Sequence, residues 1–321
     1  MLEVLKYFPS NLRSVLENEI DDKENNIEEI RIRVKRPIIL KFKESEKLVR
    51  YIVGQEEILN ILQLVCENSI YSYQNQIAQG FVTVSGGHRV GISGSCVIEN
   101  GKVININYIN SLNFRVSRQI LGCSDNILEM VLNLEGNTIY NTLIVSQPGC
   151  GKTTITRDLV RQISTGIKRL KFKGMNVGVV DERGEIASLY KGISQNEVGI
   201  KTDVMDNVPK NIGMKMLIRS MAPQVIVADE IGSSEDVEII NYAMCCGCKG
   251  IFTVHGECFD DLYLNPIIKV LLNTYIFERI IFLDSKIKGE VKEMYVLNKN
   301  EMQYKKYEEK DVLKVDKLFG E

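Results

Sequence analysis

The sequence predicts an α/β protein in which a smaller α+β domain precedes a larger domain with a mostly parallel sheet. The chain has 321 residues, which suggests two domains at roughly 150 residues each. Up to about residue 122, helical patterns are mixed with segments in which apolar and polar residues alternate as they do in antiparallel strands. Beyond that point apolar strands alternate with helical patterns, which favours a parallel sheet with right-handed crossovers. We therefore predict domains at residues 1–122 and 123–321.

The composition excludes several classes of protein. The 40 Lys and Arg residues against 42 Asp and Glu give a net charge of −2, and 44% of the residues are hydrophobic. These values argue against a disordered chain and against nucleic acid as a partner. No run of about 18 apolar residues occurs, so we expect no membrane span. The N-terminus lacks the pattern of a secretion signal, so we expect a cytoplasmic protein with reduced cysteines.

The elements of the first domain follow from periodicity and turn residues. Pro9 and Ser10 open an early helix, and a hairpin-like pair of strands occupies 27–34 and 38–42. A helix fits 54–69, where apolar residues recur at helical spacing. Asn100-Gly101 is a strong type I′ turn signal within a run of antiparallel strands. The strands of this run are predicted at 81–85, 89–98, 103–109 and 113–117.

The elements of the second domain alternate between strand and helix. Helices are predicted near 124–134, 151–164, 213–221 and 235–246. Strands are predicted at 138–145, 177–180, 225–228 and 250–254.

The strongest chemical signal is a phosphate-binding loop between a strand and a helix. Small residues let backbone N–H groups approach phosphates, and the helix N-terminus adds partial positive charge. We expect Lys152 to reach the β- and γ-phosphates and the Thr153 hydroxyl to ligate Mg²⁺. Ser146 stands where the pattern has glycine, which leaves the shape of the first turn open. The predicted nucleotide-binding residues are Gln147, Pro148, Gly149, Cys150, Gly151, Lys152, Thr153 and Thr154.

Charged residues follow three further predicted strands. Asp229 is expected to hold Mg²⁺, and Glu230 to orient or deprotonate the attacking water, which favours hydrolysis over transfer to another substrate. Glu182 follows the strand 177–180, and His255 ends a fourth strand, where a polar side chain can sense the γ-phosphate. Each position also has a simpler interpretation. Glu230 could cap the helix that follows, Glu182 could belong to a turn of solvated charges, and His255 could end a strand without a function.

With the phosphate-binding loop and the three strand ends that carry charged residues in this order, the chain resembles the secretion-type ATPases of type II and type IV secretion. It resembles more closely the stage III sporulation protein AA family of spore-forming bacteria, over nearly the whole chain. The stretches that carry this closer resemblance are 28–33, 86–94, 113–118, 181–186, 199–204, 216–221 and 229–232.

The resemblance implies a RecA-like P-loop NTPase domain that hydrolyses ATP with Mg²⁺ and assembles as a hexameric ring. In secretion ATPases the N-terminal domain supplies arginines to the γ-phosphate, and the matching positions are Arg89, Arg115 and Arg118. Guanidinium groups stabilise the charge of phosphoryl transfer. Arg219, in one of the matching stretches, is a further candidate catalytic residue. Glu182 corresponds to part of the family's acidic box.

By the same resemblance, His255 corresponds to the family's histidine box. The resemblance also implies a place in the mother cell at the outer forespore membrane. The protein would power or assemble a channel there, with membrane proteins of sporulation as partners.

Three other functions stay open at this stage. Cys245, Cys248, His255 and Cys258 are potential zinc ligands, although buried thiols explain the cysteines more simply. A nucleic-acid-dependent RecA-type ATPase shares the same motor, and the near-neutral charge weakens this alternative. A nucleotide switch that organises partners without hydrolysis is the third alternative.

Overall fold

The computed structural model describes residues 3–20 and 27–307. The chain divides into two compact units. Unit 1 comprises Met1–Arg118 and Ser188–Asn196, and unit 2 comprises Gln119–Ala187 and Glu197–Glu321.

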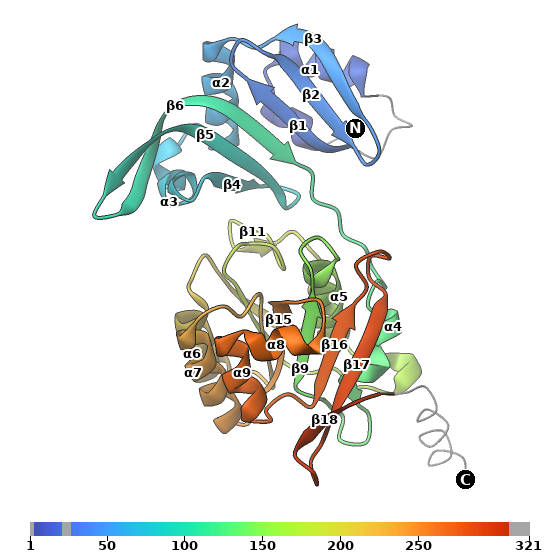
Figure 1. Ribbon diagram of the computed structural model, residues 1–321. Helices are drawn as coiled ribbons and strands as arrows, with labels where there is room; N and C mark the ends of the chain where they lie inside the picture. Colours follow the sequence, from blue (N-terminus) through green and yellow to red (C-terminus); the bar gives the residue numbers. More distant parts are fainter. Residues whose placement is uncertain (1–2, 21–26, 308–321) are drawn as a thin grey trace. The chain divides into compact units, whose positions relative to one another are not determined.

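Unit 1 is an α+β structure, with a six-stranded antiparallel sheet among its described residues, in the order β3-β2-β1-β6-β5-β4 (Figure 1). Apolar side chains from the sheet and from the N-terminal helices form its core. The strands are β1 (Ile27–Arg33), β2 (Pro37–Phe42), β3 (Glu46–Ile52), β4 (Phe81–Val84), β5 (His88–Glu99) and β6 (Lys102–Arg115). The helices are η1 (Glu3–Tyr7), α1 (Ser10–Glu19), α2 (Gln55–Val65), η2 (Ile70–Tyr73) and α3 (Gln74–Ala78).

Two predictions for unit 1 are wrong in detail. The predicted strands at 103–109 and 113–117 are one continuous strand, β6. Tyr108 has a φ of 47° within this strand, and the pairing of β5 with β6 shifts register nearby, so a local irregularity there resembles a turn in the sequence. The helix predicted at 54–69 ends at Val65, because Glu67 and Asn68 adopt left-handed backbone conformations.

Unit 2 contains an eight-stranded sheet in its described part, in the order β13-β10-β14-β15-β9-β16-β17-β18. The first six strands in this order are parallel, and the last two are antiparallel additions. This confirms the predicted α/β fold with a parallel-rich sheet. The strands are β9 (Thr142–Ser146), β10 (Val177–Asp181), β13 (Thr202–Asp206), β14 (Val225–Ala228), β15 (Lys249–His255), β16 (Arg279–Leu283), β17 (Val291–Asn298) and β18 (Gln303–Lys306).

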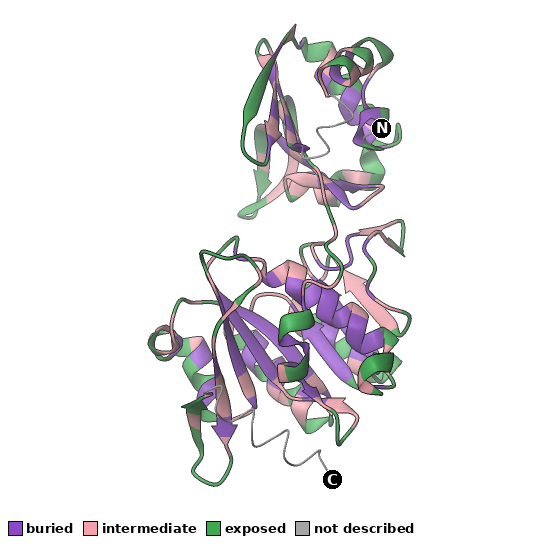
Figure 2. Ribbon diagram, turned by 90° about the vertical axis from the view of Figure 1, so that its right-hand side faces the viewer, coloured by how far each residue is buried: buried purple, intermediate pink, exposed green. Residues whose placement is uncertain are grey.

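Helices enclose the central parallel strands β9, β10, β14 and β15, which are buried along most of their length (Figure 2). Such strands read as continuous apolar runs because both faces of the sheet are covered. One core cluster joins alternate strand residues such as Ile226 and Phe252 to apolar residues of α6, α7 and α9. The helices are α4 (Asp125–Val131), α5 (Lys152–Thr165), η3 (Lys168–Leu170), α6 (Lys210–Met221), α7 (Ser234–Cys245), α8 (Phe259–Leu264) and α9 (Pro266–Asn273). In the described part of the chain, no helix is long and apolar enough to cross a bilayer.

A short hairpin leaves unit 2 and packs in unit 1. Its strands are β11 (Leu189–Tyr190) and β12 (Ile193–Ser194). The Tyr190 hydroxyl and the Lys191 ammonium bind the carboxylate of Glu67, and the side chain of Gln195 accepts a 2.7 Å hydrogen bond from the Gly86 N–H. Over the described residues, the backbone therefore passes between the two units at 118–119, 187–188 and 196–197.

Candidate active site

The phosphate-loop sequence joins the end of β9 to the start of α5. Gly149 and Gly151 have φ values of 80° and 96°, in the left-handed region where glycine is favoured. Ser146 is the last residue of β9 and pairs with His255 of β15. Because Ser146 is in extended strand, this position does not require the backbone freedom of glycine. Its hydroxyl donates a 2.9 Å hydrogen bond to the carbonyl oxygen of Gln147.

Lys152, the first residue of α5, has its side chain folded against the loop. It is 8% exposed, and its Nζ donates to the carbonyl oxygen of Ser146 at 2.9 Å. The same Nζ lies 2.6 Å from Nδ1 of His255. Burial lowers the pKa of Lys152 to about 8, although the carboxylates of Glu230 and Asp229 act in the opposite direction. The loop therefore holds a cation at the position where phosphates are expected to bind.

The sheet order places Glu182, Asp229, Glu230 and His255 at neighbouring strand ends. Strands β10, β14, β15 and β9 are consecutive neighbours and parallel, so their carboxyl ends lie at one edge. Ligands bind at this edge in open α/β sheets. Glu230 follows β14, the strand between β10 and β15. One oxygen of Glu230 lies 3.2 Å from Nε2 of His255, and the other 3.2 Å from the guanidinium of Arg183. Asp229 accepts a 3.1 Å hydrogen bond from the Thr253 hydroxyl.

The acidic segment after β10 has one structural and one accessible carboxylate. Asp181 is 1% exposed and accepts hydrogen bonds from the backbone N–H groups of Glu185, Ile186 and Ala187, so it shapes the loop. Glu182 accepts a 2.7 Å hydrogen bond from Lys210 at the start of α6.

Glu182 also lines an open cavity of about 400 Å³ beside Glu230. The two predicted catalytic carboxylates therefore face the same cavity. Its charged lining residues are Glu182, Arg183, Lys210, Glu230, Glu235 and Asp236.

The residues of this edge fit a nucleotide with Mg²⁺. Thr153 lies in the first turn of α5, and Asp229 at the end of β14 carries a carboxylate; hydroxyl and carboxylate oxygens are the ligands that Mg²⁺ prefers. The 14-residue helix α5 directs its N-terminal N–H groups and positive dipole end toward the loop. Apart from Gly149 and its two neighbours in the chain, no atom of the described residues lies within 4 Å of the place where a Cβ on Gly149 would stand, so the backbone there is open to a ligand.

Other residues of the predicted nucleotide site have internal contacts. Gln147 donates a 2.8 Å hydrogen bond to the carboxylate of Glu257, an acceptor that was not predicted. The Cys150 side chain is buried within the loop. Pro148 and Thr154 complete the segment between β9 and the second turn of α5.

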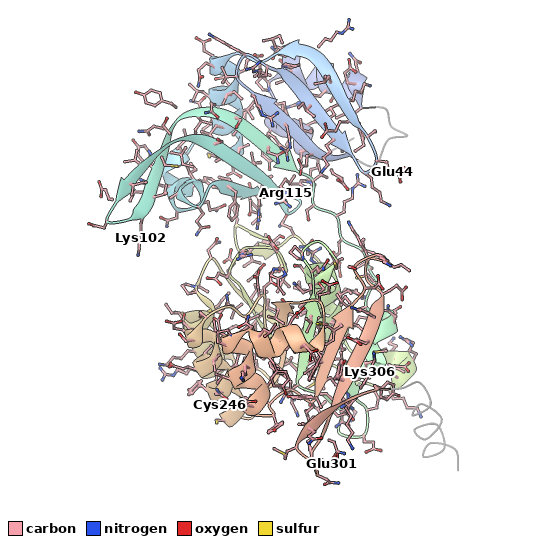
Figure 3. The ribbon with its side chains drawn as sticks, in the orientation of Figure 1. Glu44, Lys102, Arg115, Cys246, Glu301 and Lys306 are labelled. Carbon is pink, nitrogen blue, oxygen red and sulfur yellow. The ribbon has the colours of Figure 1, made fainter. Side chains whose placement is uncertain are left out.

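The three predicted arginines of the first domain belong to unit 1, whereas the phosphate loop belongs to unit 2. Arg89 and Arg115 are directly opposite each other on β5 and β6. The guanidinium of Arg89 lies 4.1 Å from the ring centre of Phe81, and Arg118 donates to the carbonyl oxygen of Ile27 at 3.0 Å. Arg115, labelled in Figure 3, is exposed at the end of β6. Their role in catalysis stays a prediction.

Arg219 belongs to unit 2 but lies apart from this row of strand ends. It is exposed in the last turn of α6 and lines a different surface cavity, with Ile212 and Met216. It does not line the cavity beside Glu230. Its catalytic role therefore also stays a prediction.

The four potential zinc ligands have separate environments. Cys245 is exposed at the end of α7, whereas Cys248 is buried with its thiol donating to the carbonyl oxygen of Pro223. His255 contacts Lys152 and Glu230, and Cys258 precedes α8. Within residues 3–20 and 27–307, no group of three or more His, Cys, Asp or Glu side chains is placed to hold a metal ion.

Sequence reasoning missed the roles of Arg183 and Lys210. Arg183 lies inside the charged segment after β10, but a single charge in a predicted turn does not reveal its partner. Lys210 follows Pro209 at the start of α6, three residues before the predicted helix start, and carries no motif. The carboxylates that pair with these two side chains belong to other segments, which the parallel alignment of the strands brings close to them.

Comparisons with known proteins agree with this architecture. The family model described as "Sporulation stage III, protein AA" matches residues 2–302. The chain is 36% identical to "Stage III sporulation protein AA" of Bacillus subtilis (strain 168) over 296 residues, which cover 92% of this chain and 95% of that protein.

Two solved structures show the same fold at low identity. The ATPase DotB of Legionella pneumophila has a TM-score of 0.59 and 13% identity, covering 91% of this chain and 82% of that one. The pilus retraction motor PilT with bound ADP has a TM-score of 0.53 and 17% identity, covering 88% and 78%. The fold is that of the RecA-like secretion ATPases with an N-terminal domain. On the match along its length and the identity to its Bacillus relative, the chain belongs to the stage III sporulation protein AA family.

Proposed function

We propose that this protein is a Mg²⁺-dependent ATPase that acts as a secretion-type motor in sporulation. The observation that carries the proposal is the position of Glu230. Its carboxylate lies at the strand edge next to the phosphate loop and is linked through His255 to the loop lysine, Lys152. A carboxylate in this place suits the activation of water beside a γ-phosphate.

Each residue of the edge has a role in this proposal. The backbone N–H groups of the loop and the ammonium of Lys152 bind the phosphates. Thr153 and Asp229 hold Mg²⁺, which when bound neutralises phosphate charge. Glu230 orients a water molecule, whose oxygen bonds to the γ-phosphorus while the bond to the ADP oxygen breaks, and accepts the proton released.

We further propose that the active form is a homo-oligomer, a hexameric ring. In this form Arg89, Arg115 and Arg118 of the N-terminal domain supply positive charge to the γ-phosphate. Membership of a sporulation family supports a role at the mother-cell side of the forespore envelope, with membrane proteins of the channel as partners. The secretion-ATPase fold supports the motor.

The proposal is tested with purified full-length protein in a phosphate-release assay with and without Mg²⁺. We expect slow Mg²⁺-dependent hydrolysis of ATP that Lys152→Ala abolishes and Glu230→Gln reduces by at least about tenfold. Lys168→Ala, an exposed lysine in η3, is the matched control and should hydrolyse ATP normally.

Light scattering with and without nucleotide reports the oligomeric state in the same preparations. Hydrolysis that survives Lys152→Ala contradicts the proposed site. Nucleotide binding without any turnover would instead indicate a switch, and a particle that stays monomeric with nucleotide contradicts the ring.

A further inference from the structure

The Glu230 carboxylate is held on both sides. Nε2 of His255 lies 3.2 Å from one oxygen, and Nη1 of Arg183 lies 3.2 Å from the other. This follows from the topology of the sheet. Glu230 follows β14, which lies between β10 and β15. Arg183 is in the loop after β10, and His255 is the last residue of β15. Each neighbouring strand, or the loop that follows it, therefore contributes one polar contact to Glu230.

The hydrogen-bond roles on the His255 side follow from charge. An ammonium group has only donors, so the contact of 2.6 Å between Lys152 and His255 makes Nδ1 the acceptor. The ring proton is then on Nε2, which lies 3.2 Å from one carboxylate oxygen of Glu230. Glu230 thus accepts a hydrogen bond from Arg183 on one oxygen and has the polar Nε2 of His255 close to the other, and a carboxylate with about four lone-pair sites can still accept from water.

The loop that carries Arg183 is held at its base by several hydrogen bonds. The buried carboxylate of Asp181 accepts from three consecutive backbone N–H groups, those of residues 185–187. The Gly184 N–H donates to the Asp181 carbonyl oxygen at 3.1 Å, and Gly184 has a φ of 64°. Groups that place a reacting side chain act best from such fixed backbone. The Arg183 side chain itself is 63% exposed, so its ion pair contributes little to folding, and its removal should leave the fold intact.

We propose that Arg183 is a positioning residue that, with His255, holds the Glu230 carboxylate in the orientation it needs to react with water; this inference rests on the proposed hydrolysis. Without Arg183, one oxygen of Glu230 loses its partner and the carboxylate turns more freely about its last bond. Hydrolysis slows as a result, whereas nucleotide binding, which depends on the loop and Lys152, is preserved.

The kinetic test compares Arg183→Ala and Arg183→Lys with the control Arg169→Ala. Arg169 pairs with Glu129 on the surface and is similarly exposed, but it lies in η3. We expect Arg183→Ala to lower kcat by about tenfold, while KM and the Kd of a fluorescent ATP analogue change by less than about twofold. Arg183→Lys should recover part of the loss, and Arg169→Ala should resemble the wild type. A weakened Kd with unchanged kcat would place Arg183 on the nucleotide and overturn the proposal.

A double variant tests whether Arg183 acts through Glu230. In a Glu230→Gln background, Arg183→Ala should cause no further loss of the residual turnover. If the residual turnover falls again by the same factor, Arg183 acts independently and the positioning role is wrong.

A spectroscopic measurement tests the pair without nucleotide or metal. The chain has two histidines, so ¹⁵N NMR of the imidazoles is assigned with His88→Gln. We expect the Nε2 signal of His255 to shift in Arg183→Ala and to stay unchanged in Arg169→Ala. An unchanged signal in Arg183→Ala overturns the inference. If the wild type hydrolyses no ATP, the proposed function fails, and this signal alone decides whether Arg183 holds Glu230.

Discussion

The ammonium of Lys152 and the imidazole of His255 form a 2.6 Å hydrogen bond between the phosphate loop and the end of β15. Since His255 also contacts Glu230, it joins the residue expected to bind phosphate to the residue expected to act on water. We predict that His255→Ala lowers kcat by about ten- to a hundredfold. His255→Gln, whose amide can both accept and donate, should retain more activity than His255→Ala. Steady-state kinetics of both variants measure this, and wild-type turnover in His255→Ala would contradict the link.

The lowered pKa of Lys152 predicts how ATP binding depends on pH. The pKa is about 8 in the free protein because burial disfavours the ammonium. A bound phosphate favours the ammonium and raises this pKa, so binding above pH 8 requires uptake of a proton. The affinity for ATP should therefore be constant below about pH 7.5 and fall by up to tenfold per pH unit above about pH 8.

Titration calorimetry between pH 7 and 9.5 measures this dependence. Lys152→Arg is the control, because a guanidinium stays charged throughout this range. If it binds ATP, its affinity should be nearly independent of pH. A wild-type affinity that is flat from pH 7.5 to 9.5 would show that Lys152 does not titrate in this way.

Glu278 provides a prediction about acid stability. Burial alone would raise its pKa, but hydrogen bonds from Lys249, Lys299 and the Asn141 N–H outweigh burial and hold the pKa at about 2. Because the folded-state pKa lies below the ordinary value of 4.5, the stabilisation is present above about pH 4.5 and is lost as the pH falls toward 2.

Glu278→Gln should lower the free energy of unfolding at pH 7 by about 3 kcal/mol. The difference from the wild type should shrink below pH 4. Urea unfolding at pH 7, 5 and 3 measures it. Glu301→Gln removes an exposed surface pair with Lys305 and should cost less than about 0.5 kcal/mol. Equal stability of Glu278→Gln and the wild type at pH 7 would contradict the assigned ion pairs.

Arg115 tests the contribution of the N-terminal domain. Its side chain is exposed, so Arg115→Ala should leave unit 1 folded. We predict a loss of hydrolysis by about a hundredfold or more with ATP binding retained, because a guanidinium acts on the charge that develops during phosphoryl transfer. Arg118→Ala is a poorer probe, since Arg118 also holds the carbonyl oxygen of Ile27.

The control for this prediction is Arg50→Ala, an exposed arginine of β3. Filter binding and phosphate release are measured on the same preparations. Equal losses of binding and hydrolysis in Arg115→Ala would rule out a role confined to the transition state.

Much of unit 2 could be predicted because its central strands β9, β10, β14 and β15 are buried on both faces. Val225–Ala228 and Val177–Asp181 read as apolar runs, and each is followed directly by charged residues. The phosphate loop was visible because Gly149, Gly151 and Lys152 stand at fixed spacing between a strand and a helix. These patterns depend only on residues that are close together in the sequence, and the structure contains the corresponding strands, loop and helix.

Features that depend on pairing between distant segments could not be predicted. The partners of Glu230 come from residues 47 positions before it and 25 positions after it. The antiparallel strands β17 and β18 are mixed in polarity, with only Met294 and Leu297 buried among them, so their periodicity is weak. The hairpin β11–β12 is too short to give a pattern of its own.

That hairpin has a consequence for how the gene can be divided. A fragment that ends at residue 122 lacks the partner that Gly86 and Glu67 have in the intact chain. A fragment that starts at 123 carries Tyr190 and Lys191 without Glu67. Neither fragment therefore contains both sides of these contacts. A chimaera between two relatives must take residues 188–196 from the same parent as the N-terminal segment.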